Sequence, residues 1–350
     1  MFRHPDASAR VIEGVLMRRS ALAWPLLAAL CAALPASAAT FVARTSASGS
    51  PGPGGEQKDM VSGQLPVLAQ SEHQGSRLVP YDPIPPVAPY EAHTLVSSRA
   101  TASADMGGVH LLANASGLIE DAQPYYFSTF SAHAKASGGF GDSFTISAPG
   151  AVGFLQGTAS FSVHALLSGA VQLAGSQDPA IPGNAEVYVN WTARMVVSGA
   201  NGILGDVSLS GGCNSLSSFA GGSFRCGGDP LGVYAMSLSF AAGQTLSVSI
   251  EGEVSTSVFG TQARGGMAQA VGQADFGHTL AWGGFQDVRD ANGNPVAGFS
   301  ALSASTGFDY AAPFPATEVP EPSSWLLLLC GLVGVVRLRQ RRSGMSSCAG

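Results

Sequence analysis

Lysine is almost missing from this chain of 350 residues, with Lys58 and Lys135 as the only two copies. Charged residues make up 11% of the sequence, against roughly 25% in ordinary globular proteins. Exposed helices usually draw on Lys, Glu and Arg, so the sequence offers little material for them. It contains 45 Gly together with many Ser, Thr and Ala, a composition that favours strands and turns.

Clustered positive charge is also missing from the central part of the chain. Residues 39–336 contain nine Lys and Arg against 21 Asp and Glu, a net charge of −12. Nucleic acids and anionic membrane surfaces are bound through clustered Lys and Arg. The composition therefore argues against both as partners.

The motifs of the common enzyme classes are absent. The sequence contains no G-x-x-x-x-G-K-[ST], H-E-x-x-H, C-x-x-C or G-x-S-x-G pattern, and its seven His are scattered singly. These patterns hold phosphates, metals or nucleophiles in place. We therefore predict no cofactor, no metal and no enzymatic activity.

One pair of segments resembles the nucleophile block and the D-x-x-H block of GDSL-type esterases: Gly-Asp-Ser at 141–143 and Asp-Phe-Gly-His at 275–278. The resemblance implies Ser143 as nucleophile, His278 as its base and Asp275 as the residue that orients the base. The residue after the serine is Phe rather than Leu, and no Asn-Asp dipeptide supplies an oxyanion block. A histidine packed on a strand is the preferred interpretation of His278, and the esterase is a remote alternative.

The first 38 residues predict an export signal. It contains, in order, a basic pair, an apolar stretch and an A-x-A cleavage site: Arg18-Arg19, residues 21–34 and Ala36-Ser37-Ala38. We predict export by the Sec route and cleavage between Ala38 and Ala39; a buried N-terminal helix is the alternative. Met17 directly precedes the basic pair and is a candidate for the true start.

Cysteine is scarce, with five copies. One lies in the predicted export signal and two lie in the C-terminal segment, which leaves Cys213 and Cys226. In an exported chain, two cysteines 13 positions apart in a Gly- and Ser-rich stretch predict a disulfide that closes the loop. Two free thiols, or half of a metal site, are the alternatives.

The region between the terminal segments predicts a β-rich domain. Residues 39–93 are rich in Pro, Gly and Ser and are interpreted as a linker or irregular arm. In residues 94–312, apolar residues recur at every second position, which is typical of strands with one buried face. We predict about ten strands in an all-β fold, an antiparallel β-sandwich or jelly roll without a soluble helix. The clearest alternating runs are 187–197, 236–240, 246–250 and 276–282.

Two smaller features allow a functional and a structural interpretation. The loop DANGN at 290–294 has oxygen ligands at the spacing of a calcium loop. Pro295 stands where such a loop needs Gly, so we predict a hairpin turn. Tyr125, Tyr126 and Tyr188 have side chains that can stack on sugars, but single aromatic residues usually pack in a core or at its rim.

The end of the chain combines three features in order. They are the motif Val319, Pro320, Glu321 and Pro322, the apolar run 325–336, and the basic residues Arg337, Arg339, Arg341 and Arg342. As a helix the run would be about 18 Å long, short of the ~30 Å hydrocarbon core, so it would span a membrane only with help from its flanks. The arginines would then stay in the cytoplasm, with the body of the protein outside. A buried terminal element and a permanent single-span anchor are the alternatives.

This order of features at 319–342 resembles the PEP-CTERM sorting signal of exported proteins in Gram-negative bacteria that make exopolysaccharide. The stretch 275–313 also resembles the end of the β-rich ectodomain in many such proteins. The resemblance implies a transient inner-membrane anchor and cleavage near the motif by exosortase, a membrane-embedded cysteine transpeptidase-like enzyme.

From the sorting signal and the strand pattern together we expect an exported protein, displayed on the cell surface or released. A structural or adhesive role in the extracellular matrix, in biofilm or exopolysaccharide, is the leading hypothesis. A lectin-like carbohydrate-binding module is the alternative, and the esterase is a remote third.

Overall fold

The computed structural model describes residues 39–50, 56–62, 67–81, 90–120, 127–174, 183–217, 223–263, 266–277 and 280–314. These residues form sixteen strands and no helix, so the described part contains no helix that could span a membrane. The all-β fold class is confirmed, whereas the predicted number of strands is too low. The predicted export signal and the predicted C-terminal membrane helix lie outside the described residues.

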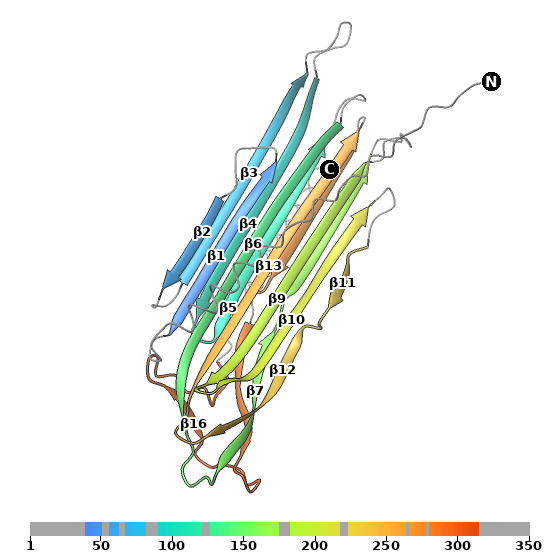
Figure 1. Cartoon of the computed structure of the whole chain (residues 1–350). Helices are drawn as coiled ribbons and strands as arrows, with labels where there is room; N and C mark the ends of the chain where they lie inside the picture. Colours follow the sequence, from blue (N-terminus) through green and yellow to red (C-terminus); the bar gives the residue numbers. More distant parts are fainter. Residues whose placement is uncertain are drawn as a thin grey trace, which may run out of the picture.

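The strands pair in two antiparallel sheets of eight strands each, stacked as a sandwich (Figure 1). We call the first one sheet A. It contains, in spatial order, β11 (Arg225–Gly228), β10 (Gly202–Ser217), β9 (Asn184–Gly199), β13 (Thr245–Ala263), β6 (Phe127–Ser147), β1 (Thr40–Ser50) and β2 (Glu56–Ser62), with β16 (Ser300–Ser303) paired to the end of β6.

The second sheet, sheet B, is built around β5 (Gly108–Glu120). On one side β5 pairs with β4 (Tyr90–Asp105), which pairs with β3 (Val67–Tyr81). On its other side β14 (Met267–Asp275) and β15 (Leu280–Arg289) follow one another along β5. Beyond them β8 (Leu166–Ala174) pairs with β14, and β7 (Phe154–Val163) pairs with β15 and with β12 (Gly232–Ala241).

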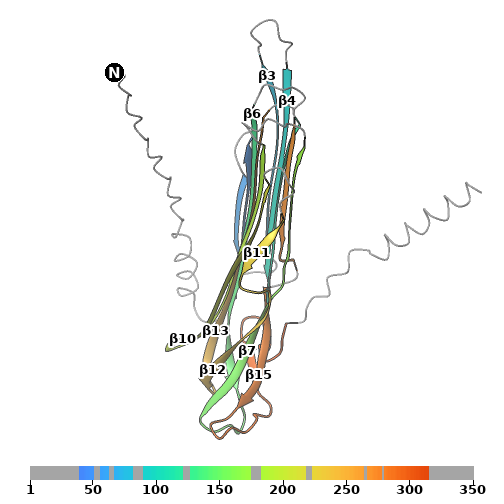
Figure 2. The same cartoon turned by 90° about the vertical axis from the view of Figure 1, so that its right-hand side faces the viewer.

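The sandwich is long and narrow. β6 has 21 residues and β13 has 19, and an extended chain rises about 3.4 Å per residue, so these two strands run for roughly 70 and 65 Å. Figure 2 shows the two sheets nearly edge-on as thin layers that extend along most of the molecule.

The alternation in the sequence correctly predicts the most regular strands. In β9 the residues Val187, Val189 and Trp191 are buried, whereas Tyr188 between them is 37% exposed. The runs 236–240 and 246–250 likewise lie in β12 and at the start of β13, with every second residue buried.

The prediction of a linker or irregular arm at 39–93 is wrong. β1, β2, β3 and the start of β4 occupy much of this segment, and Phe41, Ala43 and Val67 belong to the core. In β3 the outward Leu68 is 52% exposed, while Ser71 on the opposite face is fully buried. Small and polar residues therefore fill the inner positions, so hydropathy does not mark this strand. The first described strand of the sandwich is β1.

The run 276–282 is not one strand. Phe276 exchanges backbone hydrogen bonds with Leu111, and Leu280 resumes the pairing opposite Val109. Between these two pairings the chain moves on by four residues, from 276 to 280, whereas the partner strand β5 moves by two, from 111 to 109. Such a mismatch in the number of residues is a bulge. Phe276 and Leu280 are both fully buried, so the alternating pattern continues across the interruption and hides it.

Alanine and glycine allow the two sheets to approach closely. The inner face of β6 presents Ala132, Ala134 and Ala136, all buried. The ring of Phe130 on the same strand lies between Gly117 of β5 and Gly260 of β13, where an added Cβ would meet the ring at 2.1 and 2.2 Å. This part of the core has room for a large residue only where its neighbours are glycines.

A cluster of aromatic residues lies near one end of the sandwich. Phe144 stacks on Tyr310 with ring centroids 4.8 Å apart, and Trp282 packs edge-on against Phe285 at 5.3 Å. Trp282 Nε1 donates a hydrogen bond to the Tyr310 carbonyl at 2.9 Å. These contacts fix the last described segment, 300–314, to both sheets.

Candidate functional site

The predicted sorting and cleavage residues lie almost entirely outside the described residues. These are Ala36, Ala38, Val319, Pro320, Glu321, Pro322, Arg337, Arg339, Arg341 and Arg342. Ala39, the predicted new N-terminal residue, is described and is buried next to β1. The first described residue is therefore the one that directly follows the predicted cleavage site.

The predicted disulfide joins Cys213 of β10 to Cys226 of β11. The two residues are direct partners in the antiparallel register, with Cα atoms 4.0 Å apart. Cys213 is buried on the inner face, so the neighbouring residues Asn214 and Arg225 point outward. The bridge attaches a strand of only four residues to the edge of sheet A.

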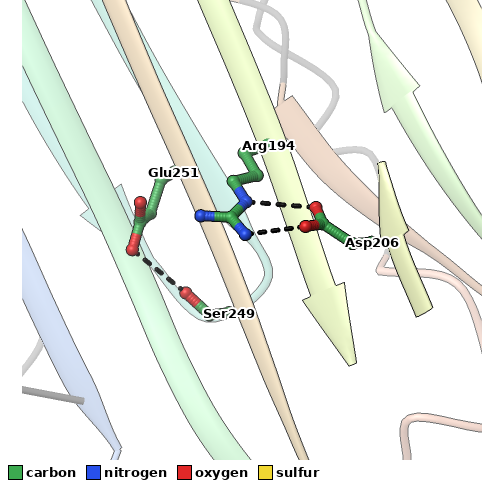
Figure 3. A network of polar contacts seen from close by, with 4 residues as sticks. All are labelled: Arg194, Asp206, Ser249 and Glu251. Carbon is green, nitrogen blue, oxygen red and sulfur yellow. Dashed lines mark hydrogen bonds and ion pairs between the residues drawn. The ribbon is translucent and has the colours of Figure 1, made fainter. Parts of the chain in front are cut away.

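The outer face of sheet A carries a network of charges (Figure 3). Arg194 of β9 donates two hydrogen bonds to Asp206 of β10, from Nε at 3.1 Å and from Nη2 at 2.7 Å. Glu251 of β13 lies opposite Arg194 in the register and accepts a hydrogen bond from Ser249. Burial raises the pKa of Glu251, and the charge of Arg194 opposes this effect. The network connects three neighbouring strands of sheet A.

Asp142, the middle residue of the Gly-Asp-Ser segment, is a buried carboxylate. It is 5% exposed and accepts hydrogen bonds from the hydroxyls of Ser305 at 2.7 Å, Thr306 at 3.0 Å and Tyr310 at 2.9 Å. Burial first, and then the Asp142 charge, raise the pKa of Tyr310, which stays protonated as a donor. In the sequence this site is indicated by an Asp at a position where the alternation of the strand places an inward-facing residue.

The bulge in sheet B places His110 beside two acceptors. His110 Nδ1 lies 2.8 Å from the Gly277 carbonyl, and Nε2 lies 3.5 Å from Asp105. Only the imidazolium form donates from both nitrogens. The hydrogen bond to Asp105 is the main cause that raises the pKa of His110, against the effect of burial.

A pocket of about 380 Å³ opens beside His110. Its lining includes Asp105, His164 and Phe314. Phe314 is the last residue described and its ring covers Gly107, where a Cβ would lie 1.8 Å from the ring. Among the described residues no cluster of His, Cys, Asp and Glu has the arrangement of a metal site.

The structure does not bring the esterase-like residues together. Ser143 lies between the inner residues Asp142 and Phe144, so its hydroxyl is on the outer face of sheet A, 2.9 Å from the Ser247 hydroxyl. Asp275 ends β14 in the opposite sheet, where it accepts a hydrogen bond from the Gly277 backbone N–H. His278 lies outside the described residues.

The DANGN loop is a turn, as predicted. Asp290 Oδ1 accepts hydrogen bonds from the backbone N–H groups of Asn292 and Asn294, both at 2.9 Å. These bonds lower the pKa of Asp290. Gly293 has a φ of 81°, a conformation that glycine adopts without strain. Of the three tyrosines considered for sugar stacking, Tyr188 is on the outer face of sheet A, and Tyr125 and Tyr126 lie outside the described residues.

Comparison with known proteins gives one result, at the C-terminus. Residues 318–342 match the model of the PEP-CTERM protein-sorting motif. The chain matches no curated protein and no solved structure. The matched residues coincide with the three-part tail recognised in the sequence, and the motif implies export, a membrane-anchored intermediate and delivery to the cell surface. The chain carries a PEP-CTERM sorting signal and is an exported protein sorted by exosortase.

Proposed function

We propose that the chain is a structural or adhesive protein of the extracellular matrix, associated with exopolysaccharide in a biofilm. The observation that carries this proposal is the combination of the sorting motif with a long, thin sandwich. Strands of this length give the sandwich two long faces that can contact the surrounding polymer. The outer face on sheet A consists mainly of short hydroxyl-bearing and charged side chains.

A lectin-like carbohydrate-binding module is the second candidate. It is favoured by Tyr188 and Phe259, two aromatic side chains that are 37% and 39% exposed on the outer face of sheet A. Exposed aromatic rings on an otherwise polar surface are common sites of recognition. Adhesion and glycan binding are compatible, since a matrix protein has to hold the polymer around it.

Fractionation of a biofilm of the native host tests the matrix role. We expect the protein in the matrix and cell-surface fractions, and a less cohesive biofilm from a strain that lacks the gene. A variant with Pro320→Ala and Glu321→Ala serves as the control, because it should stay in the inner-membrane fraction. Wild-type protein confined to the inner membrane, or an unchanged biofilm without the gene, would contradict the proposal.

We infer that export follows the Sec route and that the chain has no hydrolytic activity of its own. The separation of Ser143 and Asp275 between the two sheets supports the second inference. An ester-hydrolysing activity that disappears in the Ser143→Ala variant would overturn it.

A further inference from the structure

Six outward-facing side chains form one continuous row across sheet A. The register pairs Ser48 of β1 with His133 of β6, and His133 with Ser257 of β13. It continues from Ser257 to Tyr188 of β9, then to Asn214 of β10 and Arg225 of β11. Directly paired residues in an antiparallel sheet point to the same face. We call these six residues the outer row; at strand spacings of ~4.8 Å it is about 24 Å long.

Two hollows lie along the outer row and share Tyr188. One has a volume of about 420 Å³ and is lined by Ser48, His133, Ser257 and Phe259, among others. The other has a volume of about 430 Å³ and is lined by Asn190, Asn214 and Arg225 over a floor that includes Gly212 and Gly227. Both hollows include Tyr188 in their lining, so the surface is recessed on both sides of this residue; in the second hollow, glycines take the place of larger side chains.

The outer row and the neighbouring Phe259 combine flat rings with neutral polar groups. Tyr188 and Phe259 expose parts of their rings, and Tyr188 is held by a hydrogen bond from its hydroxyl to Glu186 at 2.9 Å. Burial, and then the nearby charge of Lys135, lower the pKa of His133, so its ring is neutral at pH 7 and lies 2.8 Å from the Ser257 hydroxyl. Asn214 adds an amide, which both donates and accepts.

Arg225 closes the row at the edge of the sheet. Its Nε donates to Ser223 at 3.0 Å, and no carboxylate of the described residues forms an ion pair with it. The disulfide between Cys213 and Cys226 lies directly beneath Asn214 and Arg225. A strand of four exposed residues would otherwise be weakly attached, so the disulfide keeps the end of the row in register.

We propose that the outer row binds a linear, uncharged polysaccharide laid across the strands of sheet A, with the tyrosine ring of Tyr188 as its central stacking platform. A pyranose has an apolar C–H face that packs on an aromatic ring and hydroxyls at its edge that need donors and acceptors. The outer row offers both over the length of a short oligosaccharide. This inference rests on the proposed association with exopolysaccharide and names the surface and the ligand class for it.

The charge of the surroundings selects an uncharged ligand. Glu186 lies next to Tyr188, and the Lys135 ammonium is already paired with Glu253 at 2.8 Å. Residues 39–336 carry a net charge of −12. A polymer with many carboxylates would be repelled by this field, and Arg225 alone would not compensate for it.

The test compares four forms of the protein expressed in a host strain that lacks the gene: wild type, Tyr188→Ala, Tyr188→Phe and Phe154→Ala. Phe154 is the matched control, because it is 67% exposed and lies in sheet B, away from the outer row. Two quantities are measured: the share of protein retained in the matrix, and the binding of the released protein to the uncharged and the acidic polysaccharide fractions of that matrix. Thermal unfolding of each variant verifies that it is folded.

We expect wild type and Phe154→Ala to bind the uncharged fraction, Tyr188→Ala to bind at least about tenfold more weakly, and Tyr188→Phe to stay within about threefold of wild type. Equal binding by wild type and Tyr188→Ala would overturn the outer row as the site while leaving the matrix role intact. Binding to the acidic fraction alone would overturn the ligand class. Wild-type protein that is not retained in the matrix would overturn the proposed function and the outer row together.

Discussion

Asp142 shows how a single residue can organise the end of this fold. A buried carboxylate is tolerated only when its oxygens accept several hydrogen bonds, and Asp142 receives them from three hydroxyls of the segment 305–310. The segment contributes Ser305, Thr306 and Tyr310 to this one acceptor. The carboxylate thereby attaches the last described segment to β6.

Replacing the carboxylate should loosen this attachment. We predict that Asp142→Asn lowers the free energy of unfolding by about 2–3 kcal/mol, because the hydrogen bonds lose their charged acceptor. Tyr310→Phe removes one of these bonds and should lower it by about 1–2 kcal/mol. Ser143→Ala, one residue away on the outer face, is the control and should change it by less than about 0.5 kcal/mol. Denaturant unfolding measures all three, and equal stability of Asp142→Asn and Ser143→Ala would contradict the assignment.

His110 predicts a pH dependence of stability. The folded pKa of His110 is raised above the unfolded value of 6.5, so its stabilising contribution is complete below pH 6.5 and is lost as the pH rises through the folded pKa. We predict that the stability difference between wild type and His110→Gln shrinks as the pH increases above 6.5. Unfolding measured from pH 5.5 to 8.5 tests this. Asp105→Asn should weaken the dependence, and a difference that grows with pH would refute the prediction.

At the scale of elements, the fit of β5, β6 and β13 depends on glycines. A methyl group at position 117 or 260 would overlap the Phe130 ring. We predict that Gly117→Ala and Gly260→Ala each destabilise the fold by about 1–3 kcal/mol, as overpacking does in other cores. Gly227→Ala in β11 is the control, because an added Cβ there meets nothing within 4 Å. Thermal unfolding compares the three, and a neutral result at both core positions would show that the sheets separate easily.

The disulfide stabilises the edge of sheet A. Closing a loop across 13 positions contributes about 3 kcal/mol in the chain-entropy model. The double variant Cys213→Ser, Cys226→Ser should lose about this amount and should no longer respond to reductant. Wild type should fall to the same stability when reduced. Unchanged stability of reduced wild-type protein would show that β11 is held without the bridge.

Strands in which large apolar residues alternate with polar residues can be predicted from the sequence. Strands without this alternation cannot. β9 is recognisable because Val187, Val189 and Trp191 alternate with polar residues. β3 is not, because Ser71 and His73 face inward while Leu68 faces outward. The bulge after Phe276 is also hidden, because register depends on the partner strand and leaves no mark on the hydropathy pattern.

The candidate sites also divide into those that local sequence predicts and those that only the folded structure brings together. The disulfide and the sorting motif depend on residue types at fixed spacing, so local sequence suffices to predict them. The outer row brings together residues from six strands, and only the pairing register places them side by side. The Asp142 cluster likewise joins residues more than 160 positions apart in the chain. In the sequence Tyr188 stands out as a candidate, but its neighbours Ser257, His133 and Asn214 do not.

At the scale of the whole molecule, the described sandwich and the matched sorting motif are only a few residues apart in the chain. Phe314, the last described residue, is fixed by its stacking on Phe308 at 3.9 Å and by its backbone hydrogen bond to Trp282. The matched motif starts at residue 318, and four residues of extended chain span at most about 14 Å. The sorting machinery therefore acts close to the folded sandwich.

The central claim is that both terminal segments are removed and that the sandwich between them reaches the outside of the cell. The intact mass of the protein recovered from outside its native host tests this claim most directly. We predict a species that starts at Ala39 and ends close to Pro322. A species that still carries residues 325–350 and is found only in membranes would contradict exosortase processing, and the proposed matrix role with it.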